Sequence, residues 1–415
     1  MDQQGTTAAH ADATAVVGAT TEFEPDVMDL LVETLRRAVR FELPTVGTDT
    51  LLGALVMGDT DAGAAIAPGM RKAGALSGVI SGRAGGGWVS DDEARGVPVA
   101  AGAEADGAEA DAAWCEARWR FGLGSRGSAS ESGRELPGMT GAMRACLLLA
   151  LRSARAEGTI SVRCRHVARA LLDLPGGRAQ EALLLQRLDP AAAAAALDGI
   201  DASALAETEG PESRGVTLLR RAGTLGRDGN RLTRALTSWT SGTSVNGSPV
   251  LFAVSVEAVR QAVRCGRAAA EPVDLLLGVL ALDRALSVAG RALPGSLRTA
   301  NAAAALMRRH GIRQDSLVSS ASAIPSPAVP DGDGVSDGNS VRLSAAAKRI
   351  MAVARLSAAE HGSPTVGTVH LLSALLDASA TDADAGDGAT VVRLLAAGQV
   401  DVAALRAELS LRPAV

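Results

Sequence analysis

The chain has 415 residues, of which 47% are hydrophobic and only 2% aromatic, and its formal net charge at pH 7 is −5. Its apolar residues are mostly alanine, leucine and valine, and it contains no tyrosine. Because alanine and leucine favour helices while strands favour β-branched and aromatic residues, the composition predicts an all-α protein. The length predicts about two to three domains, and the acidic balance argues against nucleic acid as a partner.

The features that report on cellular location agree with one another. Residues 1–22 lack the cationic start and apolar core of a signal peptide, and we expect them to be disordered. No apolar run approaches the roughly 18 residues that a membrane span requires, so we expect no membrane contact. The four cysteines are scattered along the chain and form no Cys-x-x-Cys pair: Cys115, Cys146, Cys164 and Cys265. Such a pattern fits a reduced compartment best. We therefore predict a cytoplasmic protein.

The strongest internal signal is an exact repeat. The segment Pro-Thr-Val-Gly-Thr at residues 44–48 recurs at residues 364–368. Each copy is followed, after two residues, by Leu-Leu-x-Ala-Leu, at residues 51–55 and 371–375. Self-similarity of this length near both ends of a chain indicates that the protein is built from copies of one unit.

The first copy lies in a block at residues 23–80. Its opening segment has the apolar spacing of a helix with one buried face, and Pro25 lies in the first turn, where a missing amide costs nothing. The helix should end near Leu43, because the proline that follows restricts the residue before it. Gly47 and Thr48 then supply a turn and an N-cap for a second helix.

Three further blocks follow the same pattern. The block at residues 136–206 aligns with the first when Met139 is placed on Phe23. The block at residues 250–315 is the most degenerate, and the block at residues 340–412 is the closest to the first. The last block closes with two short predicted helices, at residues 390–397 and 402–409. Each block is therefore predicted to hold about four helices.

The segments between blocks differ in composition. Residues 81–135 are rich in glycine, alanine and acids but hold three of the four tryptophans, and we expect either disorder or a small hairpin of Trp88-Val89 with residues 114–123. Residues 207–249 read as a linker with a basic helix at residues 218–239, and residues 316–339 as a flexible linker. The blocks then pair into two modules, residues 23–206 and 250–412.

Two segments carry a resemblance to a known family. Residues 46–52 read V-G-T-D-T-L-L and residues 366–372 read V-G-T-V-H-L-L, and both resemble the V-G-T-E-H-[LI]-L of the Clp N-terminal (Clp repeat) domain. The family is a tandem of two four-helix repeats that caps AAA+ unfoldases. Four positions of the chain match the histidine of the family motif. His166 and His370 carry the histidine, whereas Thr50 and Asp274 replace it.

The resemblance implies a binding module that receives adaptors and degradation substrates. In some family members the V-G-T-E segment forms a pocket for phosphorylated arginine, in which helix amides and a threonine cradle the phosphate and the acid pairs with the guanidinium. In the first copy Thr48 would supply the threonine and Asp49 the acid of such a pocket. The second copy keeps the threonine, Thr368, but has no acid after it, and His370 follows two residues later. The alternative interpretation is that Thr48 and Thr368 are structural N-caps.

Catalytic and cofactor signals are missing from the sequence. No G-x-x-x-x-G-K-[ST] is present, and the glycine-rich residues 82–87 lack the lysine and the following helix that hold a nucleotide. No G-x-S-x-G or H-E-x-x-H occurs, and the acidic residues 382–387 lack the closing glutamate of a calcium loop. We therefore expect no enzyme activity, no cofactor and no metal site.

Three functions are compatible with these observations. The first is a non-enzymatic protein that binds a Clp unfoldase, its substrates or adaptors, or ligands directed at the unfoldase, including phosphoarginine-type or peptide ligands. It would then act as an adaptor, a regulator or a decoy. The second is a non-ATPase accessory subunit of an ATP-dependent Clp protease. The third is a general helical-repeat scaffold for peptides.

Overall fold

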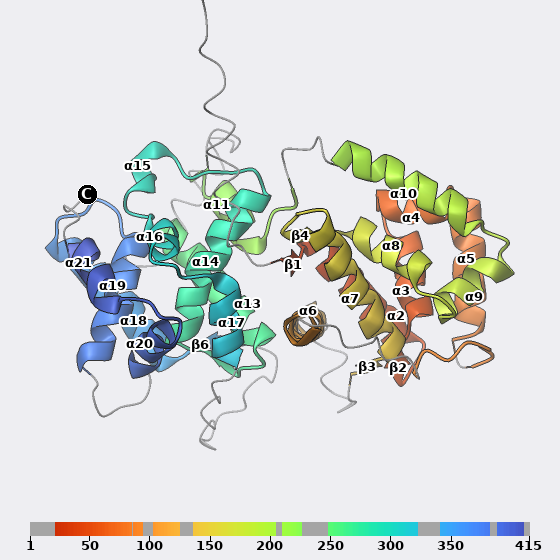
Figure 1. Cartoon of the computed structure of the whole chain (residues 1–415), viewed down its shortest axis with the longest axis horizontal. Helices are drawn as coiled ribbons and strands as arrows, with labels where there is room; N and C mark the ends of the chain where they lie inside the picture. The colour runs from red at the N-terminus through yellow and green to blue at the C-terminus, as the bar shows by residue number, and fades with distance from the viewer. Residues whose placement is uncertain are drawn as a thin grey trace, which may run out of the picture. The chain divides into compact units, whose positions relative to one another are not determined.

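The computed structural model describes residues 21–84, 86–93, 103–124, 136–204, 210–225, 248–322, 341–381 and 388–410. The described residues are mostly helical, which confirms the all-α prediction. They divide into two compact units (Figure 1). We call Thr21–Pro211 unit N, and Glu212–Ser336 together with Ser340–Val415 unit C.

The described residues of unit N contain helices and four two-residue strands. In chain order these elements are β1 (Glu22–Phe23), α2 (Pro25–Arg40), β2 (Thr45–Val46), α3 (Thr48–Met57), α4 (Asp61–Ile66), α5 (Met70–Gly82), α6 (Ala103–Gly124), β3 (Gly138–Met139), α7 (Gly141–Ala156), β4 (Ser161–Val162), α8 (Cys164–Asp173), α9 (Arg178–Leu185) and α10 (Pro190–Ala204).

Unit C follows a similar order of elements. They are α11 (Arg214–Arg221), α13 (Pro249–Arg264), β5 (Ala269–Ala270), α14 (Pro272–Val288), α15 (Gly295–Arg298), α16 (Ala303–Arg309), α17 (Gln314–Ser322), β6 (Arg342–Leu343), α18 (Ala345–Glu360), α19 (Thr368–Thr381), α20 (Gly388–Ala397) and α21 (Val402–Ser410).

The strand pairs show how the blocks are joined. In unit N, β1 pairs in parallel with β4, and β2 pairs in parallel with β3, so each block contributes the strand before its first helix and the strand before its second. In unit C, β5 pairs in parallel with β6, which joins the corresponding strands of the third and fourth blocks. The register is also equivalent, because Val46 lies opposite Met139 and Ala270 lies opposite Leu343. The described part of unit C therefore shares one of the two strand pairings of unit N.

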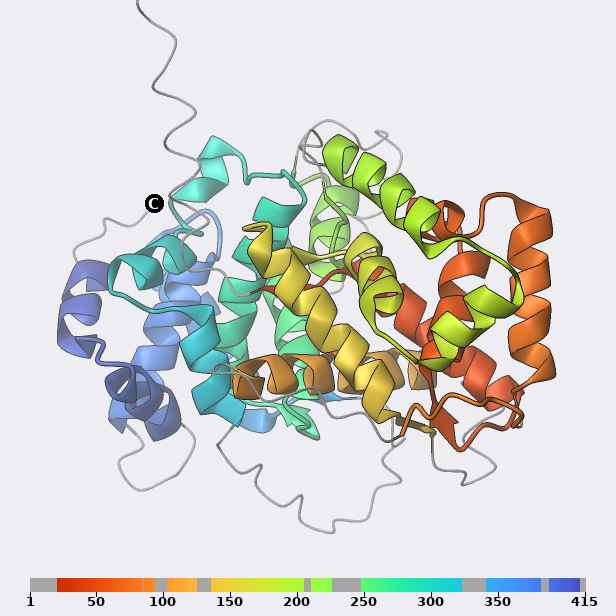
Figure 2. The same ribbon diagram turned by 45° about the vertical axis from the view of Figure 1, so that its right-hand side comes forward.

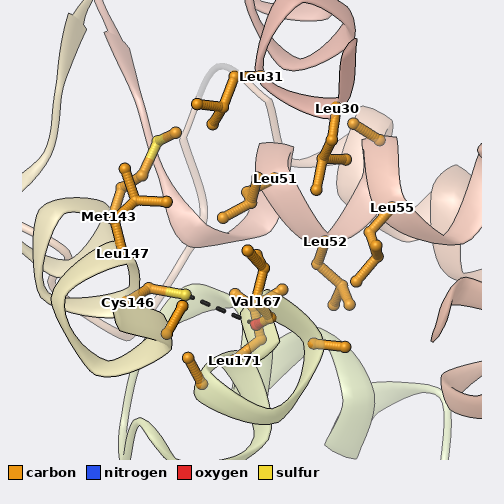
Figure 3. Close-up of a cluster of buried hydrophobic side chains, with 14 of the residues drawn as sticks. Leu30, Leu31, Leu51, Leu52, Leu55, Met143, Cys146, Leu147, Val167 and Leu171 are labelled. Carbon is orange, nitrogen blue, oxygen red and sulfur yellow. Dashed lines mark hydrogen bonds between the residues drawn. The ribbon is translucent and has the colours of Figure 1, made fainter. Parts of the chain in front are cut away.

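A central helix in each unit is buried on all sides. In α3 every residue from Thr48 to Val56 is buried, and its leucines pack against α2, α7 and α8 (Figure 3). Below α3 in this view, the Cys146 thiol contacts the Val167 carbonyl, with 3.8 Å between sulfur and oxygen. Helix α14 is the corresponding helix of unit C, and there a side chain at Gly278 would meet the backbone of α13, with its Cβ 2.7 Å from the Val254 oxygen. Glycine at this position lets the two helices approach closely.

The prediction for residues 81–135 is wrong where the structure describes them. Residues 103–124 form helix α6, which packs along α2 and also contacts α7 (Figure 2), and there is no hairpin. The helix buries Trp114 and Phe121, and its acids pair with arginines, as Asp106 does with Arg155 and Asp111 with Arg144. The acidic composition therefore indicates ion pairing on a packed helix and not disorder.

Three other boundaries differ from the sequence prediction. Glu22, expected in a disordered terminus, belongs to β1. The linker at 207–249 contains α11, which begins four residues before the expected basic helix and buries Val216 in the core of unit C. The linker at 316–339 begins inside α17, where Leu317 and Ala321 are buried. The rest of these predictions, and the acidic loop at 382–387, lie outside the described residues.

Candidate functional site

Thr48 begins helix α3 but does not cap it. The N-cap residue is Gly47, whose backbone is extended, and Thr48 is the first helical residue. The Thr48 hydroxyl instead accepts a hydrogen bond from the Ala179 amide at the start of α9, at 3.1 Å. The expectation that Thr48 caps its own helix is therefore wrong, because its hydroxyl serves a helix of the neighbouring block.

The Asp92 side chain binds the N-termini of two helices, α3 and α9. The Asp92 carboxylate is fully buried and accepts hydrogen bonds from the Thr48 amide at 2.7 Å, the Thr48 hydroxyl at 2.9 Å and the Arg178 amide at 2.9 Å. It thus lies between the N-termini of α3 and α9, where helix dipoles and free amides favour an anion. The sequence contains no spacing signal that would have identified Asp92.

The loop that carries Asp92 is fixed to α9. The Glu181 carboxylate accepts hydrogen bonds from the Val89 amide at 3.0 Å and the Ser90 amide at 2.8 Å. Glu181 also forms an ion pair with Arg83 at 2.7 Å, and the Arg83 guanidinium lies over the Trp88 ring. These contacts fix the segment that precedes Asp92 and thereby position its side chain.

Glycine is required at position 47 because two carboxylates converge there. A Cβ atom on Gly47 would lie 2.5 Å from one oxygen of Asp49 and 2.8 Å from one oxygen of Asp92. Real Cβ atoms do not approach oxygen this closely, so any side chain would displace one of the two acids. The glycine of the Val-Gly-Thr repeat therefore has a packing reason in unit N.

Asp49, the predicted partner of a guanidinium, lies in the interior. Its side chain is only 3% exposed, and its Oδ1 atom has no hydrogen-bond partner. Burial and the nearby charge of Asp92 raise the pKa of Asp49 to about 6, against the opposing effects of Arg178 and the Thr50 amide. In this conformation Asp49 is not open to a ligand from solvent.

We expect Asp49→Asn to stabilise unit N at neutral pH. Because the pKa of Asp49 is about 6 when folded and about 3.9 when unfolded, the native state holds this proton more tightly. The resulting stability is full below about pH 4 and is lost as pH rises through about 6. Asparagine should therefore raise the free energy of unfolding by about 2–3 kcal/mol at pH 7.5 and have little effect at pH 4.

Urea denaturation followed by tryptophan fluorescence at several pH values measures this effect, because Trp88, Trp114 and Trp119 all belong to unit N. Asp59→Asn is the control, since Asp59 is exposed. A parallel pH dependence of the parent and the Asp49→Asn variant would contradict the prediction.

Thr368 has an equivalent position in unit C. Its amide donates to the Asn301 side-chain oxygen at 3.0 Å, and its hydroxyl accepts from the Ala303 amide at 3.4 Å. Asn301 thus takes the place that Asp92 has in unit N, with a neutral amide in place of a carboxylate. A Cβ on Gly367 would overlap the carbonyl of Ala300, so the glycine is again required by packing.

His370 accepts a backbone hydrogen bond at the start of α19. The Gly367 amide donates to its Nδ1 atom at 3.1 Å. The same bond is made at the start of α8, where the Arg163 amide donates to His166 Nδ1 at 2.8 Å, and an equivalent bond at α14 ends on Asp274. Three of the four positions that match the family histidine therefore carry an acceptor that caps the helix.

His370 also borders a pocket of unit C. The pocket has a volume of about 390 Å³ and lies between α18, α19 and α21 and the residues that follow α15. Burial, and then the neighbouring His361, lower the pKa of His370. Of the four predicted site residues, only His370 borders this pocket, whose lining is Thr299, Ala300, Ser357, His361, Val369, His370, Ser373, Leu376, Asp377, Arg406, Ala407, Leu409 and Ser410.

Comparison with protein-family models, with curated proteins and with solved structures gave no significant match. The resemblance to the Clp N-terminal domain thus depends on the residues of this chain alone. Within the described ranges no helix combines the length and apolar character of a membrane span. In the same part of the chain, no three His, Cys, Asp or Glu side chains are grouped to hold a metal ion.

Proposed function

We propose that the chain is a non-enzymatic protein-binding module of the Clp proteolytic system, acting as an adaptor, regulator or decoy for substrates, adaptors or unfoldase-directed ligands. The observation that carries the proposal is the equivalent joining of blocks in two units, with Val-Gly-Thr at the start of α3 and of α19. A duplicated four-helix repeat is the architecture that the sequence resemblance implies.

The exposed apolar side chains of α18 support a role in protein binding. Val353 and Leu356 are 44% and 63% exposed and lie three residues apart, so they share one side of the helix. Ser357 of the same helix and His361, which directly follows the helix, border the pocket of unit C. An apolar pair beside a pocket is a common arrangement at sites that receive a partner's side chain.

A phosphoarginine-type ligand could bind at Thr48 and Asp49 only after the Asp92 side chain has left this position. The helix amides that would hold its phosphate already donate to Asp92, and Asp49 is buried. Such a ligand would therefore bind only when the Asp92 loop leaves its position. We accordingly place the first contact with protein partners on unit C.

Direct binding to a purified Clp unfoldase tests the proposed function. Biolayer interferometry with the full chain immobilised should show saturable binding to the unfoldase or to one of its purified adaptors. Leu356→Asp should weaken this binding about tenfold. Leu184→Asp is the matched control, because Leu184 is also 63% exposed but lies on α9 of unit N.

Each other outcome has a defined meaning. No binding to the unfoldase or its adaptors would contradict the Clp proposal and favour a general peptide scaffold. Stimulation of peptide cleavage by an assembled Clp protease would favour an accessory subunit. ATP hydrolysis or peptide cleavage by the purified chain alone would contradict the assignment as a non-enzyme.

A further inference from the structure

The pocket of unit C has a hydrogen-bond donor on His370 that the backbone does not use. Because the Gly367 amide donates to Nδ1, that nitrogen is unprotonated, and the neutral ring carries its proton on Nε2. Burial lowers the pKa of His370, which favours the neutral form of the ring. The Nε2–H edge of the ring is therefore the one left for the pocket.

A second donor comes from α21. The Arg406 Nε atom is buried and has no hydrogen-bond partner, while a terminal nitrogen of the same guanidinium donates to the Leu376 carbonyl. That second bond fixes the orientation of the side chain. The Arg406 guanidinium borders the pocket with a full positive charge, so an anionic oxygen of a ligand gains a charge-assisted hydrogen bond from it.

The remaining polar groups of the pocket favour a negatively charged ligand. The His361 Nδ1 atom is 2.7 Å from the Ser357 carbonyl, which can only accept, so this nitrogen donates and fixes the orientation of the ring at the border of the pocket. Among the described residues of the lining, the one carboxylate is that of Asp377, which is exposed and accepts a hydrogen bond from the Ser373 hydroxyl at 3.2 Å. The described lining thus sets two histidines and one arginine against a single exposed carboxylate.

We propose that this pocket binds a small organic anion, whose oxygen atoms accept hydrogen bonds from His370 and Arg406. The walls formed by Val369, Leu376 and Leu409 are apolar, so the rest of the ligand is a short apolar group. The volume of about 390 Å³ holds a group of the size of an amino acid or a small phosphate ester. Carboxylate and phosphate share this recognition chemistry.

The test is a titration of the full chain with two probes, inorganic phosphate and N-acetyl-leucine, followed through the imidazole NMR resonances of His361 and His370. We expect saturable shifts of both histidines with at least one probe. A response to phosphate alone identifies a phosphorylated ligand, and a response to N-acetyl-leucine alone identifies a carboxylate. No saturable shift with either probe overturns the assignment.

Three variants separate binding from folding. His370→Asn keeps an oxygen that accepts from the Gly367 amide but removes the Nε2–H donor, so it should fold normally and bind about tenfold more weakly. Arg406→Gln should weaken binding similarly. Arg349→Gln is the control, because Arg349 is an exposed residue of α18 that does not border the pocket. Equal weakening by all three variants would show non-specific attraction and would also overturn the assignment.

Discussion

Replacing Asp274 with alanine is expected to destabilise unit C by about 3–5 kcal/mol, because it leaves a buried guanidinium without its partner. Asp274 is fully buried and forms an ion pair with Arg267, which is only 5% exposed. Arg267 also donates to the Ala321 carbonyl in α17, so the pair links two helices. The carboxylate further accepts from the Glu271 amide and caps α14, and alanine loses that bond too.

The ion pair does not fully offset the cost of its own burial. Burial raises the pKa of Asp274 to about 6, although Arg267 and the Glu271 amide oppose that rise. Breaking one side of such a pair is therefore more harmful than removing both charges. We expect the double variant Arg267→Met with Asp274→Asn, in which asparagine keeps the cap, to recover most of the lost stability.

Hydrogen exchange measured by mass spectrometry would assign the loss to unit C, through faster exchange of α14 and α17. Asp283→Ala is the matched control on the same helix, because Asp283 pairs with Arg308 at a site where the acid is 39% exposed. An exposed pair contributes about 1 kcal/mol or less. Similar losses for Asp274→Ala and Asp283→Ala would contradict this account.

The repeated helices could be predicted because helix signals are local. The apolar spacing of residues 27–38 and the prolines at 25 and 44 predict α2 closely, and the last two helices were predicted within two residues of their observed ends. Helix α6 was missed for the opposite reason. Its acids look like a solvated segment until Arg144 and Arg155, which lie more than thirty residues along the chain, are placed beside them.

The surroundings of the predicted site depended on contacts that no local pattern records. The repeat correctly placed Thr48 and Thr368 at helix starts, yet the partner of the Thr48 hydroxyl is Ala179, in the neighbouring block. The acid at this helix end comes from Asp92, in a segment with no counterpart in the other blocks. The shift of the N-cap from Thr48 to Gly47 is a single residue, which is the usual uncertainty of a helix boundary.

Replacing Asp92 with alanine is expected to destabilise unit N by about 3–5 kcal/mol, because two helix N-termini lose the same acceptor. The Thr48 and Arg178 amides would be left buried and unpaired, at about 1–3 kcal/mol each, and the Thr48 hydroxyl would lose its acceptor as well. Relief of the repulsion with Asp49 recovers part of this loss. Asp92→Asn should have an intermediate effect, because one of its two terminal groups is a donor that faces other donors.

Urea denaturation followed by tryptophan fluorescence measures the total loss, and hydrogen exchange at residues 48–51 and 178–181 locates it. Asp91→Ala is the matched control, since Asp91 is exposed and accepts only from the Glu93 amide. If Asp92 joins the two blocks through α3 and α9, both helix starts must become less protected together in Asp92→Ala and remain protected in Asp91→Ala. Loss of protection at only one helix would show that the carboxylate caps that helix alone and does not connect the blocks.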